Sequence, residues 1–148
     1  MNILIFGGTR FVGKSFLLHA LAAGHNLTVI SRRAPMAHPR LTYVQVEKDF
    51  FNPTSDVEHF DVTLDFLAYD AETTRRAQAL FPFTPYVMIS SAWVSQYILD
   101  QRIFSPREHE YIRGKLRAET LLEEKFRDGF PVKIIRLPIT FGSNDHTN

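Results

Sequence analysis

Residues 3–13 carry the pattern that most restricts the fold of this chain. An apolar run at 3–6 is followed by a glycine-rich turn at 7–9 and by a helix expected over about 11–23, which Gly24 closes. Successive apolar residues without polar alternation are typical of a strand that is covered on both faces, as in a parallel sheet. A buried strand, a tight turn and a helix in this order predict the start of an α/β fold.

The same alternation continues along the chain, and two helix starts have recognisable caps. Asp70 is expected to cap a helix at 70–80, and Ser105-Pro106-Arg107-Glu108 is a capping box with proline at the first helical position. Right-handed crossovers predict a Rossmann-type α/β fold, with a doubly wound parallel sheet in the order 3-2-1-4-5-6. Further elements are expected as strands at 27–31, 41–46, 61–68, 86–90 and 132–137, a helix from 106 to near 129, and a short crossover helix or irregular loop at 52–60.

Composition narrows the classes of protein that are possible. The chain has 148 residues, 45% of them apolar and 22% charged, which predicts one globular domain over residues 1–148. A formal charge of +1 argues against a polyanion binder that works by overall charge. The N-terminal apolar run is too short for a signal peptide or a spanning helix, so we expect a cytoplasmic protein with no membrane partner.

Residue types also exclude some chemistries. Cysteine is absent, so the chain has no disulfide, thiolate metal ligand or cysteine nucleophile. The six histidines show neither H-x-x-x-H nor H-E-x-x-H spacing, and we therefore expect no metal site.

Residues 7–15 match two different nucleotide-binding motifs. Read from Gly8, they fit the P-loop pattern G-x-x-x-x-G-K-[ST], for which Asp65 is a candidate magnesium ligand. Read from Gly7, they fit a dinucleotide fingerprint in which Arg10 replaces the middle glycine. Either turn, with the helix N-terminus behind it, predicts an anion site.

Side-chain size favours the dinucleotide interpretation. A P-loop wraps its central residues around a phosphate, whereas a dinucleotide turn starts the helix at once, which suits the bulky Phe11 and Val12. One apolar helical stripe would then begin inside the supposed loop. Its members would be Val12, Phe16, Ala20 and Ala23. A P-loop nucleotidase stays open as the less favoured alternative.

Cofactor-binding residues are expected beyond the carboxyl ends of the strands. Arg10 must swing outward, where it can lie along the adenosine or pair with a phosphate. The second strand ends in Ser31-Arg32-Arg33 and no acid follows until Glu47, which predicts NADP as the cofactor rather than NAD, although NAD stays possible. The predicted contacts from the turn and the fourth strand are Gly7, Thr9, Arg10, Phe11, Val12, Gly13 and Ala68.

Three side chains form a candidate catalytic set. Tyr111 and Lys115 lie four residues apart on one face of the capped helix, and Ser91 follows the strand at 86–90. A tyrosine pKa is normally near 10, and a neighbouring ammonium together with a cationic nicotinamide ring would lower it. We therefore predict that Tyr111 is the general acid/base, that Ser91 holds the substrate oxygen and that the cofactor carries the hydride.

These motifs together resemble the extended or atypical short-chain dehydrogenase/reductase superfamily, which includes NAD(P)-dependent nucleotide-sugar epimerases and dehydratases. The resemblance rests on Gly-Gly-Thr-Arg-Phe-Val-Gly at 7–13, Ile-Ser-Ser-Ala-Trp-Val at 89–94 and Tyr-Ile-Arg-Gly-Lys at 111–115. It implies an oxidoreductase or epimerase/dehydratase-like enzyme for a hydroxyl or carbonyl substrate, with a nucleotide sugar as one candidate.

The resemblance also implies roles for single residues. Ser91, Tyr111 and Lys115 match the family's reactive trio, and Lys115 also contacts the cofactor. Asp49 resembles the position beside adenine, and Pro138 lies in the segment that reaches the nicotinamide. The helices at 70–80 and 106–127 correspond to a homodimer interface in the family.

Two departures from the family pattern keep other interpretations open. Arg10 in the glycine motif is most similar to a branch that includes the chloroplast stem-loop RNA-binding proteins. A redox-silent dinucleotide-binding module with an RNA-binding or regulatory role is therefore the main alternative, and RNA is a less favoured partner. Family members normally continue past the sixth strand into a substrate-binding region. We therefore expect residues 1–148 to be a fragment that lacks this region, binds cofactor and turns over little substrate.

Overall fold

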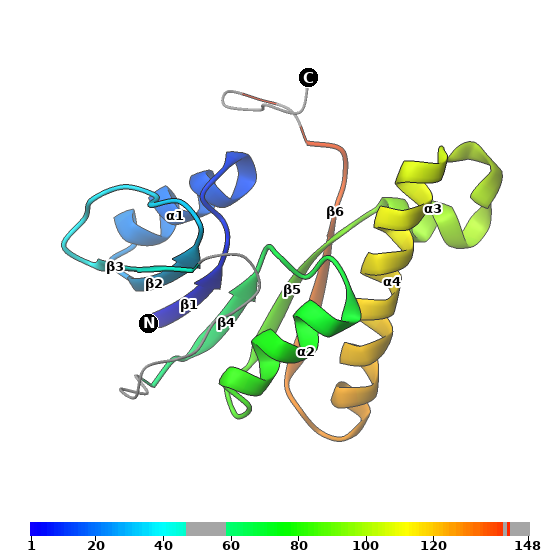
Figure 1. The fold of residues 1–148 in the computed structure, drawn as a ribbon. Coiled ribbons are helices and arrows are strands. Elements are labelled where there is room, and N and C mark those ends of the chain that lie inside the picture. Colours follow the sequence, from blue (N-terminus) through cyan, green and yellow to red (C-terminus); the bar gives the residue numbers. More distant parts are fainter. Residues whose placement is uncertain (47–58, 141, 143–148) are drawn as a thin grey trace. The chain divides into compact units, whose positions relative to one another are not determined.

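The structure is a computed structural model that describes residues 1–46, 59–140 and 142. Within these residues six strands form a sheet in the order β3-β2-β1-β4-β5-β6, which confirms the predicted Rossmann-type topology. The elements in chain order are β1 (Asn2–Phe6), α1 (Phe11–Ala22), β2 (Asn26–Ser31), β3 (Leu41–Gln45), β4 (Val62–Asp65), α2 (Ala71–Leu80), β5 (Tyr86–Ser91), α3 (Trp93–Leu99), the 3-10 turn η1 (Gln101–Ile103), α4 (Pro106–Arg127) and β6 (Val132–Leu137) (Figure 1).

Contacts within the chain divide it into two compact units. One contains Met1–Phe66 with β1 to β4 and α1, and the other contains Leu67–Thr140 with α2 to β6. In the first unit β1 pairs in parallel with both β2 and β4, and β2 pairs in parallel with β3. Its core is made of fully buried aliphatic side chains, which are Leu4 and Ile5 of β1, Leu17 of α1 and Val29 of β2.

The second unit is built on parallel pairing of β5 with β6. The long helix α4 buries Ile112, Ala118 and Leu122, and α2 lies alongside it (Figure 1). Met88 and Tyr86 of β5 are also buried in this unit.

Helix α3 and the turn η1 were not expected from the sequence, which predicted no element between residues 91 and 105. Val94 and Tyr97 are spaced three residues apart and pack against Ile112 of α4. Trp93, Phe104 and Leu116 surround this cluster. Asp100 then accepts a hydrogen bond from the Arg102 amide at 3.0 Å and starts η1. The segment is helical because its two buried side chains find a partner on α4.

The fourth strand is shorter than predicted. It ends at Asp65 and not at residue 68, although the Phe66 amide still donates to the Phe6 carbonyl at 3.0 Å. Ala68 is fully buried in the following turn. An apolar residue in a buried loop looks like strand in the sequence, which explains the error. The segment 52–60 lies almost entirely outside the described residues.

Both predicted helix caps are present. Asp70 Oδ1 accepts from the Thr73 amide at 2.8 Å, and the Ser105 and Glu108 side chains accept reciprocally from each other's amides at 3.4 and 2.7 Å. Each bond satisfies an amide that has no partner within its helix.

Replacement of Ser105 by alanine should remove one side of this box. We expect Ser105→Ala to lower the free energy of unfolding by about 1 kcal/mol, the usual loss for an N-cap hydroxyl. Urea denaturation followed by circular dichroism measures this change. Ser105→Asp is the matched control, because aspartate also caps helices, and it should retain most of the stability.

Candidate functional site

The turn after β1 requires glycine at several positions. Gly7 and Gly8 have φ angles of 78° and 70°, in the left-handed region that glycine adopts without strain. A Cβ on Gly13 would lie 2.3 Å from the Gly8 Cα, so only glycine lets the start of α1 approach the turn this closely. Phe11, the first residue of α1, also has a positive φ of 39°. A residue with a side chain is strained there by about 1–3 kcal/mol, and such strain often accompanies functional turns.

The position of the helix start favours the dinucleotide interpretation over the P-loop. Helix α1 begins at Phe11, and the Lys14 amide already donates to the Arg10 carbonyl at 3.1 Å. Gly13 and Lys14 therefore lie inside the helix rather than in a loop that could wrap around a phosphate. Arg10 is the N-cap residue and is exposed, Thr9 and Val12 are partly buried, and Asp65 is fully buried.

The predicted apolar stripe of α1 is wrong by about one residue. The buried side of the helix is formed by Gly13, Leu17, Ala20 and Leu21, while Val12 and Phe16 are half-buried and Ala23 is exposed. The reason is the close contact between Gly13 and Gly8. It places the side of α1 that contains Gly13 and Leu17 against the rest of the unit.

At the end of β2 lie two exposed arginines, Arg32 and Arg33, and a serine, Ser31, whose hydroxyl already makes a hydrogen bond. The Ser31 hydroxyl is buried and donates to the Arg33 carbonyl at 2.6 Å. It is therefore not available as a phosphate donor unless this bond breaks, contrary to the simplest expectation for a serine at this position. Arg32 and Arg33 are both exposed, so the predicted recognition of a 2′-phosphate depends on their guanidinium groups. The predicted adenine-side residue Asp49 lies outside the described residues.

In the second unit, Lys115 and Tyr111 are brought together on α4. Lys115 is 2% exposed, and its Nζ donates to the Ile89 carbonyl of β5 at 2.8 Å. The same ammonium lies 6.0 Å from the centre of the Tyr111 ring and 4.9 Å from that of Tyr69. The lysine therefore connects α4 to β5 and places its ammonium group beside the Tyr111 phenol.

The acidity of Tyr111 differs from the expectation. Burial raises the pKa of the Tyr111 phenol above its usual value, and the neighbouring Tyr69 phenol raises it further. The sequence argument predicted a lowered pKa because it considered only the ammonium and the cofactor. Partial burial of the Tyr111 side chain, which removes water from the phenol, is the largest cause of the raised pKa.

Ser91 is connected to Tyr111 through Trp93. The Ser91 hydroxyl oxygen accepts a hydrogen bond from the Trp93 amide at 3.2 Å, and the Trp93 ring meets the Tyr111 ring edge-on at 6.4 Å between centroids. Pro138, which follows β6, is exposed.

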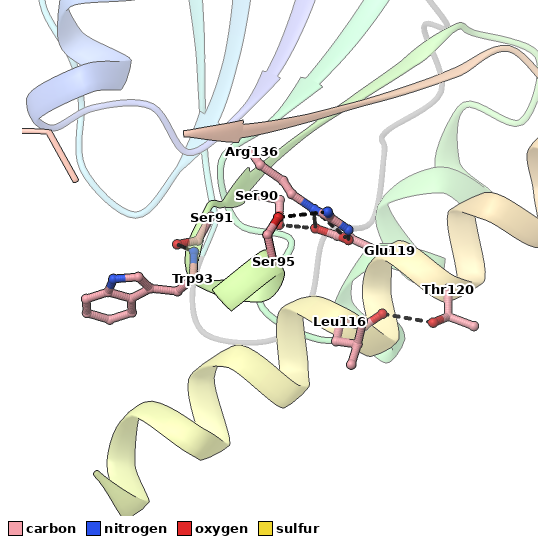
Figure 2. Close-up of polar contacts among 8 residues, drawn as sticks. All are labelled: Ser90, Ser91, Trp93, Ser95, Leu116, Glu119, Thr120 and Arg136. Atoms are coloured by element: carbon pink, nitrogen blue, oxygen red, sulfur yellow. Dashed lines mark hydrogen bonds and ion pairs between the residues drawn. The ribbon is translucent and has the colours of Figure 1, made fainter. Parts of the chain in front are cut away.

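A buried polar network beside Ser91 was not found from the sequence (Figure 2). Glu119 of α4 is 1% exposed and accepts from the Ser90 hydroxyl at 2.5 Å and from the Arg136 guanidinium of β6. Arg136 also donates to the Ser95 hydroxyl of α3 at 3.0 Å. One carboxylate thus joins α4 to β5 and β6, and through Arg136 to α3. The only sequence signal was the four-residue spacing of Glu119 from Lys115, which places both on one face of the helix.

Among the described residues, no group of three or more histidine and acidic side chains is arranged to hold a metal ion. No helix among those residues is both long enough and apolar enough to cross a membrane.

The solved structures similar to this chain include epimerases, dehydratases and reductases, some of them solved with NAD, which agrees with the motif resemblance. The chain matches UDP-galactose 4-epimerase with a TM-score of 0.71 and 17% identity, over 92% of this chain and 55% of that one. It matches dTDP-glucose 4,6-dehydratase from Bacillus anthracis, solved with NAD, with a TM-score of 0.67 and 18% identity, over 97% and 56%. A short-chain dehydrogenase/reductase superfamily protein from Agrobacterium tumefaciens with bound NAD has a TM-score of 0.69 and 20% identity, over 92% and 48%. At these identities the likeness establishes the Rossmann-type fold.

A curated relative agrees with the resemblance seen in the glycine motif. The chloroplast stem-loop binding protein of 41 kDa b from Arabidopsis thaliana is 27% identical over 84% of this chain and 39% of its own length. No protein-family model matches the chain. The chain thus spans about half the length of these three solved proteins and less than half of this relative.

Proposed function

We propose that this chain is the NADP(H)-binding part of an oxidoreductase or epimerase/dehydratase-like enzyme. Its substrate would carry a hydroxyl or carbonyl group, and a nucleotide sugar is the first candidate because several fold neighbours are named for such substrates. The observation that carries the proposal is the buried Lys115, which faces Tyr111 and is hydrogen-bonded to the end of β5.

The glycine turn fits a dinucleotide. The positive φ angles of Gly7 and Gly8 and the contact between Gly13 and Gly8 leave no side chain over the N-terminus of α1 at these positions. The first turn of this helix has no acidic residue to repel a pyrophosphate. We propose that the turn residues 7–13 hold the pyrophosphate and that Arg32 and Arg33 hold the 2′-phosphate.

The reactive set divides the chemistry among three side chains. The nicotinamide ring, when bound, would accept or supply the hydride. Tyr111 would move the proton of the substrate hydroxyl, and Lys115 would stabilise the phenolate that forms. The Ser91 hydroxyl, whose oxygen accepts from the Trp93 amide, keeps its own proton available to hold the substrate oxygen.

Calorimetric titration with NADPH, NADH and ATP-magnesium tests the cofactor assignment. We expect saturable binding of a nicotinamide dinucleotide and no comparable binding of ATP-magnesium. Gly13→Val is the control variant that should lose cofactor binding, because the valine side chain would collide with the Gly8 backbone. Tighter binding of ATP-magnesium than of either dinucleotide would support the P-loop alternative instead.

The cofactor preference provides a sharper prediction. NADPH should bind about tenfold to a hundredfold more tightly than NADH, because a charge-assisted contact contributes about 1.5–3 kcal/mol. Arg32→Asp should remove or reverse this preference with little change in stability, since Arg32 is exposed. Arg107→Asp alters the net charge equally on an exposed residue of α4 and should leave the preference unchanged. Equal affinities, or tighter NADH binding, in the unmodified protein would contradict the prediction.

A redox-silent role with RNA is the second candidate, and the name of the curated relative favours it. The exposed cations of α2 are weak support, because Arg75 and Arg76 both pair with Glu72 at 2.6 and 2.8 Å. A stem-loop RNA titrated at several salt concentrations distinguishes the candidates. Tight, salt-dependent binding together with bound cofactor and no turnover would favour the RNA role.

We also propose a homodimer through α2 and α4, which pack side by side in the second unit. Light scattering over a concentration series measures the mass directly, and a monomer at all concentrations would rule the dimer out.

A further inference from the structure

Tyr69 was not among the predicted site residues, yet it lies closer to Lys115 than Tyr111 does. It occupies the short segment between β4 and α2, one residue before the cap Asp70. The Lys115 Nζ is 4.9 Å from the Tyr69 ring centre and 6.0 Å from the Tyr111 ring centre. The two rings are themselves in contact, with centroids 6.4 Å apart and planes inclined by 53°. The ammonium therefore faces two aromatic rings, and Tyr69 is the nearer.

The backbone fixes Tyr69 in this place. A Cβ on Gly114 would lie 2.3 Å from the Tyr69 carbonyl oxygen, so the segment before α2 passes directly against α4 at this glycine. Figure 1 shows this segment entering α2 beside α4. The Tyr69 amide donates to the Leu67 carbonyl at 2.6 Å, which closes the turn on its other side. Gly114 stands between Tyr111 and Lys115 in the sequence, so one close approach brings Tyr69 to both.

The contact has a clear electrostatic consequence. A lysine that is 2% exposed loses hydration, which disfavours its charged form. The Ile89 carbonyl compensates through one hydrogen bond. An aromatic ring face is electrostatically negative and attracts a cation placed at this distance over it. Loss of the nearer ring should therefore make the ammonium easier to deprotonate.

We propose that Tyr69 is a positioning residue of the reactive set, and that its ring holds the Lys115 ammonium in place beside Tyr111. The catalytic value of this contact rests on the proposed function, but the contact itself does not. The ring and the hydroxyl of Tyr69 have separate effects. The ring stabilises the ammonium, whereas the phenol oxygen disfavours a phenolate on Tyr111.

Two variants separate the ring from the hydroxyl. Tyr69→Leu removes the aromatic face, and Tyr69→Phe retains it. In protein with isotope-labelled lysine, the Lys115 side-chain signals are followed by NMR through a pH titration without cofactor or substrate. Among the five lysines of the chain, the signal that Lys115→Arg removes is that of Lys115.

We expect Tyr69→Leu to lower the pKa of Lys115 by about 0.5–1 unit and to reduce the ring-current shift of its terminal methylene to the part that the more distant Tyr111 ring contributes. Tyr69→Phe should leave both at their unmodified values. Phe83→Leu removes an aromatic ring that is 93% exposed and should also change nothing. If Tyr69→Leu leaves the Lys115 signals unchanged, or if Tyr69→Phe shifts them as much as Tyr69→Leu does, the proposal is wrong.

The readout does not depend on turnover. Altered Lys115 signals in Tyr69→Leu, combined with full activity of a Tyr111 variant, would therefore retain this inference and reject the proposed function. Because Tyr69 is half exposed, we expect both variants to fold, and a two-dimensional amide spectrum checks this.

Discussion

In the full-length protein, Tyr111→Phe should lower the rate of the chemical step by about a hundredfold or more and leave the affinity for cofactor unchanged. This is the usual loss when a general acid/base is removed. The ring remains, so its edge-on contact with Trp93 and its packing near Lys115 are retained. The measurement is the formation or consumption of reduced cofactor in single-turnover reactions with a panel of nucleoside diphosphate sugars.

The matched control is Tyr97→Phe. Tyr97 is a buried tyrosine of α3 whose hydroxyl meets His109 Nδ1 at 3.2 Å, outside the proposed reactive set. This variant should retain activity. A fully active Tyr111→Phe enzyme would remove the phenol from the mechanism, and loss of activity in both variants would indicate a general structural effect.

The pKa of Tyr111 should depend on the oxidation state of the bound cofactor. Since burial and Tyr69 raise the pKa of the phenol, the protein without cofactor should hold Tyr111 protonated at neutral pH. A cationic nicotinamide ring favours the phenolate, so oxidised cofactor should lower this pKa while reduced cofactor should not. Ultraviolet titration of the tyrosinate, compared between the unmodified protein and Tyr111→Phe, measures both states. An identical Tyr111 pKa with oxidised and reduced cofactor would contradict the argument.

The fold was predictable because its signals are local. An apolar run, a glycine turn and an amphipathic stretch each depend on neighbours in the sequence, and so do the caps at Asp70 and Ser105. The topology then follows from the handedness of the crossovers. The same local reasoning failed for α3. This helix forms because its buried Val94 and Tyr97 pack against Ile112 of α4, which is distant in the sequence.

The candidate site was less predictable because much of it depends on tertiary contacts. The spacing of Tyr111 and Lys115 is visible in the sequence, but the arrival of Tyr69 depends on a carbonyl packed against Gly114. The rotation of α1 likewise depends on Gly13 meeting Gly8. Glu119 reads as an ordinary charged helix residue, and only its burial against Ser90 and Arg136 shows that it belongs to the interior.

Arg136→Met should lower the free energy of unfolding by about 2–3 kcal/mol. The variant leaves the Glu119 carboxylate, which is 1% exposed, without its guanidinium partner, and breaking a buried ion pair on one side typically costs about 3–5 kcal/mol. We expect the lower part of the range because the Arg136 side chain is 35% exposed, which lets water reach the pair. Urea denaturation at neutral pH measures the change.

A double variant separates the ion pair from simple packing. Replacement of both partners by apolar residues, as in Arg136→Met with Glu119→Leu, removes the uncompensated charge as well as the attraction. The double variant should therefore be more stable than Arg136→Met alone, even though it carries one more substitution in the interior. If the loss of stability in the double variant equals the sum of the losses in Arg136→Met and in Glu119→Leu, the unpaired carboxylate has no penalty of its own. The contacts among β5, β6, α3 and α4 would then depend on packing rather than on charge. If the double variant recovers stability as expected, Glu119 requires Arg136. Arg136, through Glu119, then helps to hold the end of β5 against α4. This contact positions Ser91 relative to Tyr111 and Lys115 of the same helix.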